Sequence, residues 1–123
     1  MSKDISQIEM LKVIVKALDF KKAEDIKVIK ISDLTVMADY FVIAGASSST
    51  QTRALADEAE YQVKEKLGIS PARVQGNNGS NWIVIDYNDI IVHVFHKEQR
   101  DFYSLERLWS DGEYIDISEW VTD

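Results

Sequence analysis

The sequence predicts a single α/β domain in which helices pack on a mixed β-sheet. Stretches with the periodicity of amphipathic helices alternate with short runs of β-branched residues, and a helical stretch separates two groups of strands. The chain has 123 residues, close to the commonest size of one domain, and neither a linker nor an internal repeat divides it. We therefore expect one globular unit with a shared hydrophobic core.

The first part of the chain is predicted to form a helix followed by two strands. The helix should end near Phe20, and its apolar stripe consists of Ile8, Leu11, Val15 and Leu18. β-branched residues predict a strand over 26–31, and the uninterrupted apolar run 40–44 predicts a central strand buried on both faces. These two strands are expected to be neighbours in the sheet.

A second helix is predicted to begin after Ser48. Ser48 and Gln51 have the spacing of a capping box, in which the two side chains satisfy backbone N–H groups reciprocally. Gly68 and Pro71 supply the stop. The buried stripe between them consists of Leu55, Ala59, Val63 and Leu67.

The second half should begin with a short strand over 73–75 and a polar loop over 76–81. Strands over 82–87 and 90–95 follow, joined by a two-residue turn at Asn88 and Asp89. Helical spacing predicts a last helix that carries Phe102, Leu105, Leu108 and Trp109. Residues 1–109 are thus assigned to the domain, and 110–123 to a C-terminal tail whose structure the sequence leaves open.

The predicted hairpin sorts its residues onto two faces. One face is apolar and belongs on the core; its cross-strand pairs are Tyr87 with Ile90, Ile85 with Val92, and Ile83 with Val94. The other face pairs Asp86 with Ile91, Val84 with His93, and Trp82 with Phe95. That face is too polar for an ordinary core and too apolar to be left in water without a reason. Two interpretations stay open: a partner docks there, or another helix covers it while Asp86 accepts hydrogen bonds from the turn.

Composition narrows the class of function. A net charge of −7 disfavours a broad phosphate-neutralising surface, so a basic protein is a better partner than nucleic acid. The absence of cysteine removes disulfides, thiol nucleophiles and the common structural zinc sites. The N-terminus has neither a secretory nor an organelle signal, and no apolar run could span a bilayer. We therefore expect a cytoplasmic protein that does not associate with a membrane.

Little in the sequence points to catalysis. The turn over 45–50 leads into a helix N-terminus, where an anion could bind, but no phosphate-loop lysine follows and an ordinary cap is preferred. A metal-dependent nucleotidyltransferase would need a pair of carboxylates on the next strand. The acidic residues after the turn, Asp57, Glu58 and Glu60, fall inside the predicted helix instead. Asp86 and Asp89 could form a carboxylate pair, but Asp89 belongs to the hairpin turn, where Asp is common for conformational reasons.

A metal site is not expected either. His93 and His96 have an odd spacing on a predicted strand, which sends the two imidazoles to opposite faces. The chain has only these two histidines and no cysteine, so a ligand set cannot be completed from the usual residue types. We therefore expect a protein that is not an enzyme and holds no cofactor.

Several segments in a fixed order resemble the ribosomal silencing factor family, also called Iojap-like. They are residues 38–43, the Ser48-x-x-Gln51 turn, residues 82–96, and the pattern over 102–109. The resemblance runs from about Ile8 to Trp109. It implies a nucleotidyltransferase-like α/β fold without that superfamily's catalytic carboxylates.

The resemblance also implies a function. Members of this family bind large-subunit ribosomal protein fourteen where the small subunit would join, and so block joining sterically. Carried over position by position, their contacts match Trp82, Asp86 and Tyr87, with Ile91, His93 and Phe95 as neighbours on the derived face. Tyr87 has the parity of the other face, and we expect it to wrap around the tip of the hairpin.

The sequence thus predicts a translational repressor that docks on the large ribosomal subunit. The alternatives are a large-subunit assembly factor and, third, a nucleotidyltransferase-like enzyme that uses the serine turn and Asp86 with a divalent metal. Whether free chains pair as a homodimer through the same face stays open.

Overall fold

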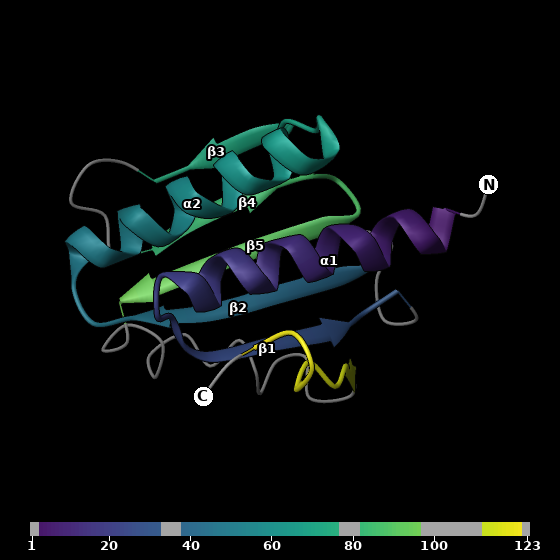
Figure 1. Ribbon diagram of the computed structural model, residues 1–123, viewed down its shortest axis with the longest axis horizontal. Helices are drawn as coiled ribbons and strands as arrows, with labels where there is room; N and C mark the ends of the chain where they lie inside the picture. Colours follow the sequence, from purple (N-terminus) through teal and green to yellow (C-terminus); the bar gives the residue numbers. More distant parts are fainter. Residues whose placement is uncertain (1–2, 33–37, 77–81, 97–111, 122–123) are drawn as a thin grey trace.

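In a computed structural model, the described residues are 3–32, 38–76, 82–96 and 112–121. They form two helices and one six-stranded sheet (Figure 1). The elements in chain order are α1 (Lys3–Phe20), β1 (Glu24–Lys30), β2 (Tyr40–Ala46), α2 (Ser49–Leu67), β3 (Arg73–Gln75), β4 (Trp82–Asp86), β5 (Ile90–His96) and β6 (Glu113–Tyr114). The predicted α/β class is confirmed.

The sheet is mixed and has the strand order β3-β4-β5-β2-β1-β6. Among the described strands, only β2 and β5 pair in parallel; β1–β2, β1–β6, β3–β4 and β4–β5 are antiparallel. The parallel pair needs a crossover, and α2 lies in the connection between β2 and β5. The predicted pairing of the first two strands is confirmed, as is the short strand over 73–75.

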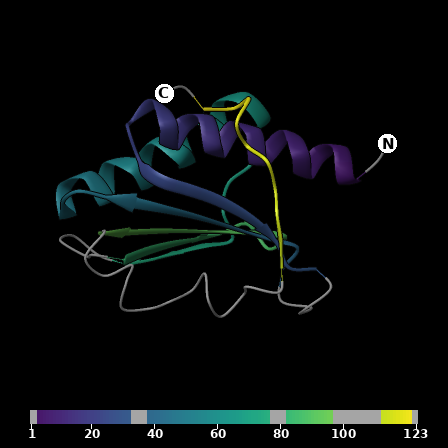
Figure 2. The same ribbon diagram turned by 90° about the horizontal axis from the view of Figure 1, so that it is seen from below.

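Both helices cover the same face of the sheet, side by side, as Figures 1 and 2 show. The larger of two hydrophobic clusters lies beneath them and draws on both helices and the four central strands. Its fully buried members include Leu11, Leu18, Leu55, Val63 and Val92. The apolar stripes predicted for the helices therefore face the sheet, except at Ile8, which is 39% exposed near the start of α1.

A second hydrophobic cluster lies on the other face of the sheet. It consists of Ile29, Ile31, Ala38, Phe41, Ile43, Ile91 and Phe95, with Trp82 and Val84 packed against it. Strand β2 contributes to both clusters because successive side chains alternate between faces, and all seven of its residues are buried. The prediction of a central strand buried on both faces is confirmed.

Helix α2 begins and ends as predicted. Ser48 Oγ accepts a hydrogen bond from the Gln51 backbone N–H at 3.0 Å, and Gly68 takes the left-handed conformation at the C-terminus with φ 70°. The reciprocal bond differs from a standard capping box, because the Gln51 side chain accepts from the Ser47 backbone N–H at 2.6 Å. Its Nε2 also donates to the Lys21 carbonyl at 3.1 Å. Gln51 therefore ties the start of α2 to the end of α1.

The tail beyond residue 110 adds to the fold. Strand β6 pairs with the outer side of β1, and residues 112–121, yellow in Figure 2, pass the edge of β1 toward the helices. Four residues of this segment pack against the larger cluster: Ile115, Ile117, Trp120 and Val121. The last helix predicted over 102–109 lies outside the described residues. Within the described ranges, neither helix is long and apolar enough to cross a membrane.

Candidate protein-docking face

The hairpin forms with the predicted register. Cross-strand partners are Trp82 with Phe95, Ile83 with Val94, Val84 with His93, Ile85 with Val92, and Asp86 with Ile91. The Tyr87 N–H donates to the Ile90 carbonyl at 2.9 Å, and Asn88 has the positive φ of 76° that this turn requires. Parity therefore separates a core side from the face that carries the candidate residues.

The candidate residues on that face differ in exposure according to their strand. Trp82 and Asp86 on β4 are half-buried, whereas the three candidates on β5 are buried, with exposed fractions of 8% for Ile91, 7% for His93 and 0% for Phe95. Strand β5 lies near the middle of the sheet, but β4 is flanked on one side only by the three-residue β3. The part of this face open to solvent is therefore the β4 side.

Strand β3 extends the exposed surface to the edge of the sheet. Arg73 is opposite Asp86 and Gln75 is opposite Val84, and directly opposed residues of an antiparallel pair share a face. Both Arg73 and Gln75 are exposed. Sequence reasoning did not assign them to the site, although the strand assignment over 73–75 and its pairing would have placed them there. We call the surface formed by Arg73, Gln75, Trp82, Val84 and Asp86 the hairpin face.

An aromatic cluster supports Trp82 from below. The Trp82 indole Nε1–H donates to His93 Nδ1 at 3.2 Å, and the Trp82 and Phe95 ring centroids are 4.9 Å apart. His93 in turn packs against Phe41, with ring centroids 4.8 Å apart and a tilt of 58°. These contacts fix the orientation of the half-buried indole before any partner arrives.

His93 is a neutral, buried imidazole. Because Nδ1 accepts from Trp82, the ring proton of the neutral form is on Nε2. This atom is buried and has no hydrogen-bond partner within the described part of the chain. Burial lowers the pKa of His93 from the usual 6.5 to about 4. Protonation would also place a hydrogen on Nδ1 and so remove the acceptor that holds the indole.

Asp86 stands at the tip end of the hairpin face. Its Oδ1 accepts from the Asn88 backbone N–H at 2.7 Å, which is the turn contact expected if the carboxylate stabilises the hairpin. Its side chain is half-buried, and this is the one side-chain hydrogen bond of Asp86 within the described part of the chain. A carboxylate has further acceptor positions, so Asp86 can stabilise the turn and still accept from a partner.

Tyr87 does not wrap around the tip, and this expectation is wrong. The side chain is 7% exposed and belongs to the larger cluster under the helices, as its parity requires. Its buried hydroxyl has no hydrogen-bond partner among the described residues, and burial together with the charge of Glu60 raises the pKa of Tyr87. The aromatic ring gains more from the core than a turn around the strand end would give it.

The acidic side chains considered for a metal-dependent site do not lie together. Asp57, Glu58 and Glu60 lie on α2, and Asp57 forms an ion pair with Arg53 at 3.3 Å. The backbone of Asp89 accepts from the N–H groups of Asp39 and Tyr40. Over the described ranges, no three His, Cys, Asp or Glu side chains are grouped so that they could hold a metal ion.

Comparison with known proteins identifies the family of this chain. The family model described as ribosomal silencing factor during starvation matches residues 4–123. The chain belongs to this family. A ribosomal silencing factor from Bacillus subtilis (strain 168) is 37% identical over 113 residues, which cover 92% of this chain and 95% of that protein. The resemblance inferred from the sequence motifs is thereby confirmed, and the matched region includes the tail.

Two further comparisons show a similar fold in a solved structure and a similar sequence in a mouse protein. A crystal structure of a protein from Chromobacterium violaceum superposes with a TM-score of 0.80 at 31% identity, covering 84% of this chain and 85% of the other. A mouse protein named for mitochondrial assembly of the ribosomal large subunit is 32% identical over 103 residues, which cover 80% of this chain and 44% of that protein. The family is thus named for a regulatory role at the ribosome and not for a catalysed reaction.

Proposed function

We propose that this chain represses translation in the cytoplasm by docking on the large ribosomal subunit through large-subunit ribosomal protein fourteen, so that the small subunit cannot join. Membership of the ribosomal silencing factor family supports the general role. The docking surface is proposed because a half-buried tryptophan, held in place by its neighbours, and a half-buried carboxylate lie at the two ends of β4 on the same face of the hairpin.

The residues of the hairpin face would have different roles in docking. Trp82 offers apolar area in a fixed orientation, which lowers the entropy lost on binding, and tryptophans of this kind dominate many interfaces. Asp86 would accept a charge-assisted hydrogen bond from a basic side chain of the partner. His93 and Phe95 would act beneath Trp82 by holding the indole, and the buried Ile91, opposite Asp86, would support the face from below.

Sedimentation with separated ribosomal subunits tests the proposal. The chain should sediment with free large subunits, should be scarce on assembled ribosomes, and should reduce joining when it is added before the small subunit. Equal binding to free large subunits and to assembled ribosomes would contradict a steric block. Binding to large subunits that lack protein fourteen would contradict the assignment of that partner.

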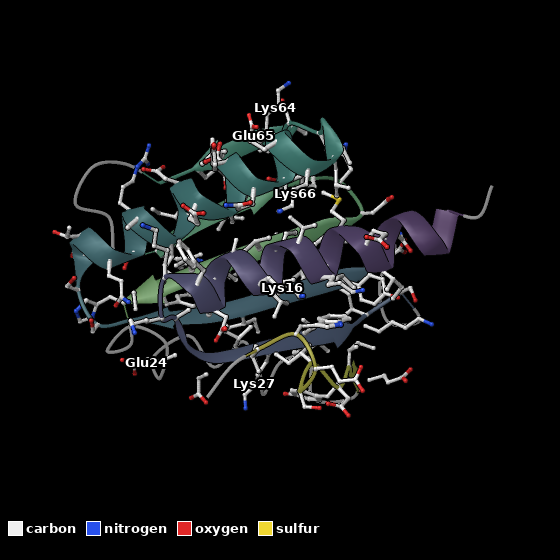
Figure 3. All side chains as sticks on the ribbon, in the orientation of Figure 1. Lys16, Glu24, Lys27, Lys64, Glu65 and Lys66 are labelled. Atoms are coloured by element: carbon white, nitrogen blue, oxygen red, sulfur yellow. The ribbon has the colours of Figure 1, made fainter. Side chains whose placement is uncertain are left out.

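Variants locate the surface. Asp86→Lys or Trp82→Ala should weaken docking by about 2 kcal/mol or more, roughly thirtyfold in affinity, if these residues are hot spots. Glu65→Lys is the matched control for the charge change, because Glu65 is an exposed carboxylate on α2, on the helix side of the sheet (Figure 3). Wild-type affinity in a folded chain that carries both Trp82→Ala and Asp86→Lys would show that docking uses another face.

Assembly of the large subunit is a second candidate function. The name of the mouse relative favours it, and both roles would use a surface that recognises the same subunit. Deletion of the gene separates them: an assembly factor leaves large-subunit precursors to accumulate during growth, whereas a repressor leaves mature subunits that join when translation should be curtailed. Light scattering or sedimentation of the free chain would show whether it pairs as a homodimer through the hairpin face.

A further inference from the structure

A groove of about 390 Å³ lies between α1 and α2 at the outer surface of the helix layer. Its described lining comes from Lys12, Val13, Lys16, Ala17 and Phe20 on α1 and from Gln62 and Lys66 on α2. Both helices lie on one side of the sheet (Figure 2), so the groove and the hairpin face are on opposite sides of the molecule. The proposed docking surface therefore does not account for the groove.

The groove is positively charged in an acidic protein. Lys12 and Lys16 are one turn apart on α1, and Lys66 approaches from α2; Figure 3 shows Lys16 and Lys66 on the helix side. No acidic side chain is among the described lining residues, and within the described ranges the three ammonium groups form no ion pair. Like charges one helical turn apart repel, so a bound anion would relieve this repulsion.

The rest of the groove wall is apolar. Val13, Ala17 and Phe20 follow one another at helical spacing, and the Phe20 side chain is 70% exposed. An exposed aromatic ring beside cationic side chains offers a surface on which a nucleobase can stack. Lys21 Nζ is 5.7 Å from the Phe20 ring centroid, which places a further cation at this end of the groove.

Size and net charge indicate the class of ligand. The groove volume lies within the roughly 300–1,000 Å³ typical of small-molecule sites. A long polyanion such as RNA would extend past the three lysines onto the surface of a chain with net charge −7, where it would be repelled. We propose that the groove binds a nucleoside polyphosphate, with its phosphates among Lys12, Lys16 and Lys66 and its base against Phe20.

Isothermal titration calorimetry on the isolated full chain tests this, without ribosomes and with a chelator in place of magnesium. ATP should bind, adenosine should not, and pyrophosphate should bind about tenfold more weakly because it lacks the stacking base. The absence of ATP binding at millimolar concentration would overturn the proposal, as would a single-stranded RNA that binds more tightly than ATP. Equal affinity for pyrophosphate and ATP would overturn the assignment of a nucleoside. Because no subunit is present, these outcomes are independent of the proposed docking.

Two sets of variants place the ligand. A chain with Lys16→Ala and Lys66→Ala should bind ATP at least about tenfold more weakly, since two charge-assisted contacts are lost. Lys64→Ala is the matched control, because Lys64 is an exposed lysine on the same helix that projects away from α1 (Figure 3). Phe20→Ala should weaken ATP binding and leave pyrophosphate binding unchanged. Unaltered ATP affinity in the double variant, or an equal loss in Lys64→Ala, would place the ligand elsewhere.

Discussion

The buried imidazole of His93 predicts that the folded chain loses stability in mild acid. The pKa of His93 is lowered from the usual 6.5 to about 4 because burial disfavours the charged form. Between these two values the unfolded chain binds a proton that the folded chain does not. The free energy of unfolding should therefore fall as the pH falls through this window, and the loss should be absent above about pH 6.5.

The size of the effect follows from the two pKa values. With 6.5 in the unfolded chain and about 4 in the folded one, the free energy of unfolding should be about 2 kcal/mol smaller at pH 5 than at pH 7.5 through His93 alone. The Trp82 indole also loses its acceptor when Nδ1 is protonated. We therefore expect the tryptophan fluorescence of the folded chain to change together with the titration of His93.

Urea denaturation of the wild type and of His93→Phe at several pH values measures this contribution. Carboxylates titrate in both proteins and cancel in the comparison, so the variant should lack about 2 kcal/mol of the wild-type loss between pH 7.5 and pH 5. His96→Gln, which removes the other imidazole of the chain, measures the contribution of the second histidine separately. The reasoning is refuted if His93→Phe and the wild type lose equal stability, or if the NMR signals of the folded-state His93 ring titrate near pH 6.5.

Four further substitutions test the backbone, a helix cap and the core by equilibrium unfolding. Gly76→Ala should cost about 1–3 kcal/mol, because Gly76 has φ 121° and an added Cβ would lie 3.0 Å from the Trp82 carbonyl oxygen; Gly68→Ala, with φ 70° and open space, should cost less. Ser48→Ala should cost about 1 kcal/mol through loss of the helix cap, and an unchanged midpoint would contradict the capping role. Tyr87→Phe should leave stability unchanged or raise it by up to about 1 kcal/mol, since it removes a buried hydroxyl for which the described residues offer no hydrogen-bond partner; a clear loss would reveal one.

Local patterns were sufficient for most of the secondary structure. The register of the β4–β5 hairpin follows from its turn and from strict alternation, so every cross-strand pair was correct. The limits of α2 follow from Ser48 at one end and Gly68 at the other. These signals act over a few residues and depend little on what packs around them.

The tail shows where local patterns fail. Strand β6 has only two residues and forms because β1 offers an unpaired edge nearby, which the sequence around it does not announce. Apolar residues alternate with Asp116 at Ile115 and Ile117, and Trp120 follows. This signal could have indicated a segment that packs on the core, as it does.

The sequence by itself determined which residues share the hairpin face, and the tertiary structure decided which of them reach solvent. Alternation along a strand sets the face of each side chain, whatever surrounds it. Burial depends on what packs around each strand: β5 lies between β4 and β2, Ile91 and Phe95 belong to the second cluster, and His93 packs against Phe41 and Phe95. Strand β4 pairs with β5 on one side but has only the three-residue β3 on its outer side, and Trp82 and Asp86 are half-buried. Of the six side chains predicted to contact a partner, long-range packing thus leaves only Trp82 and Asp86 partly exposed.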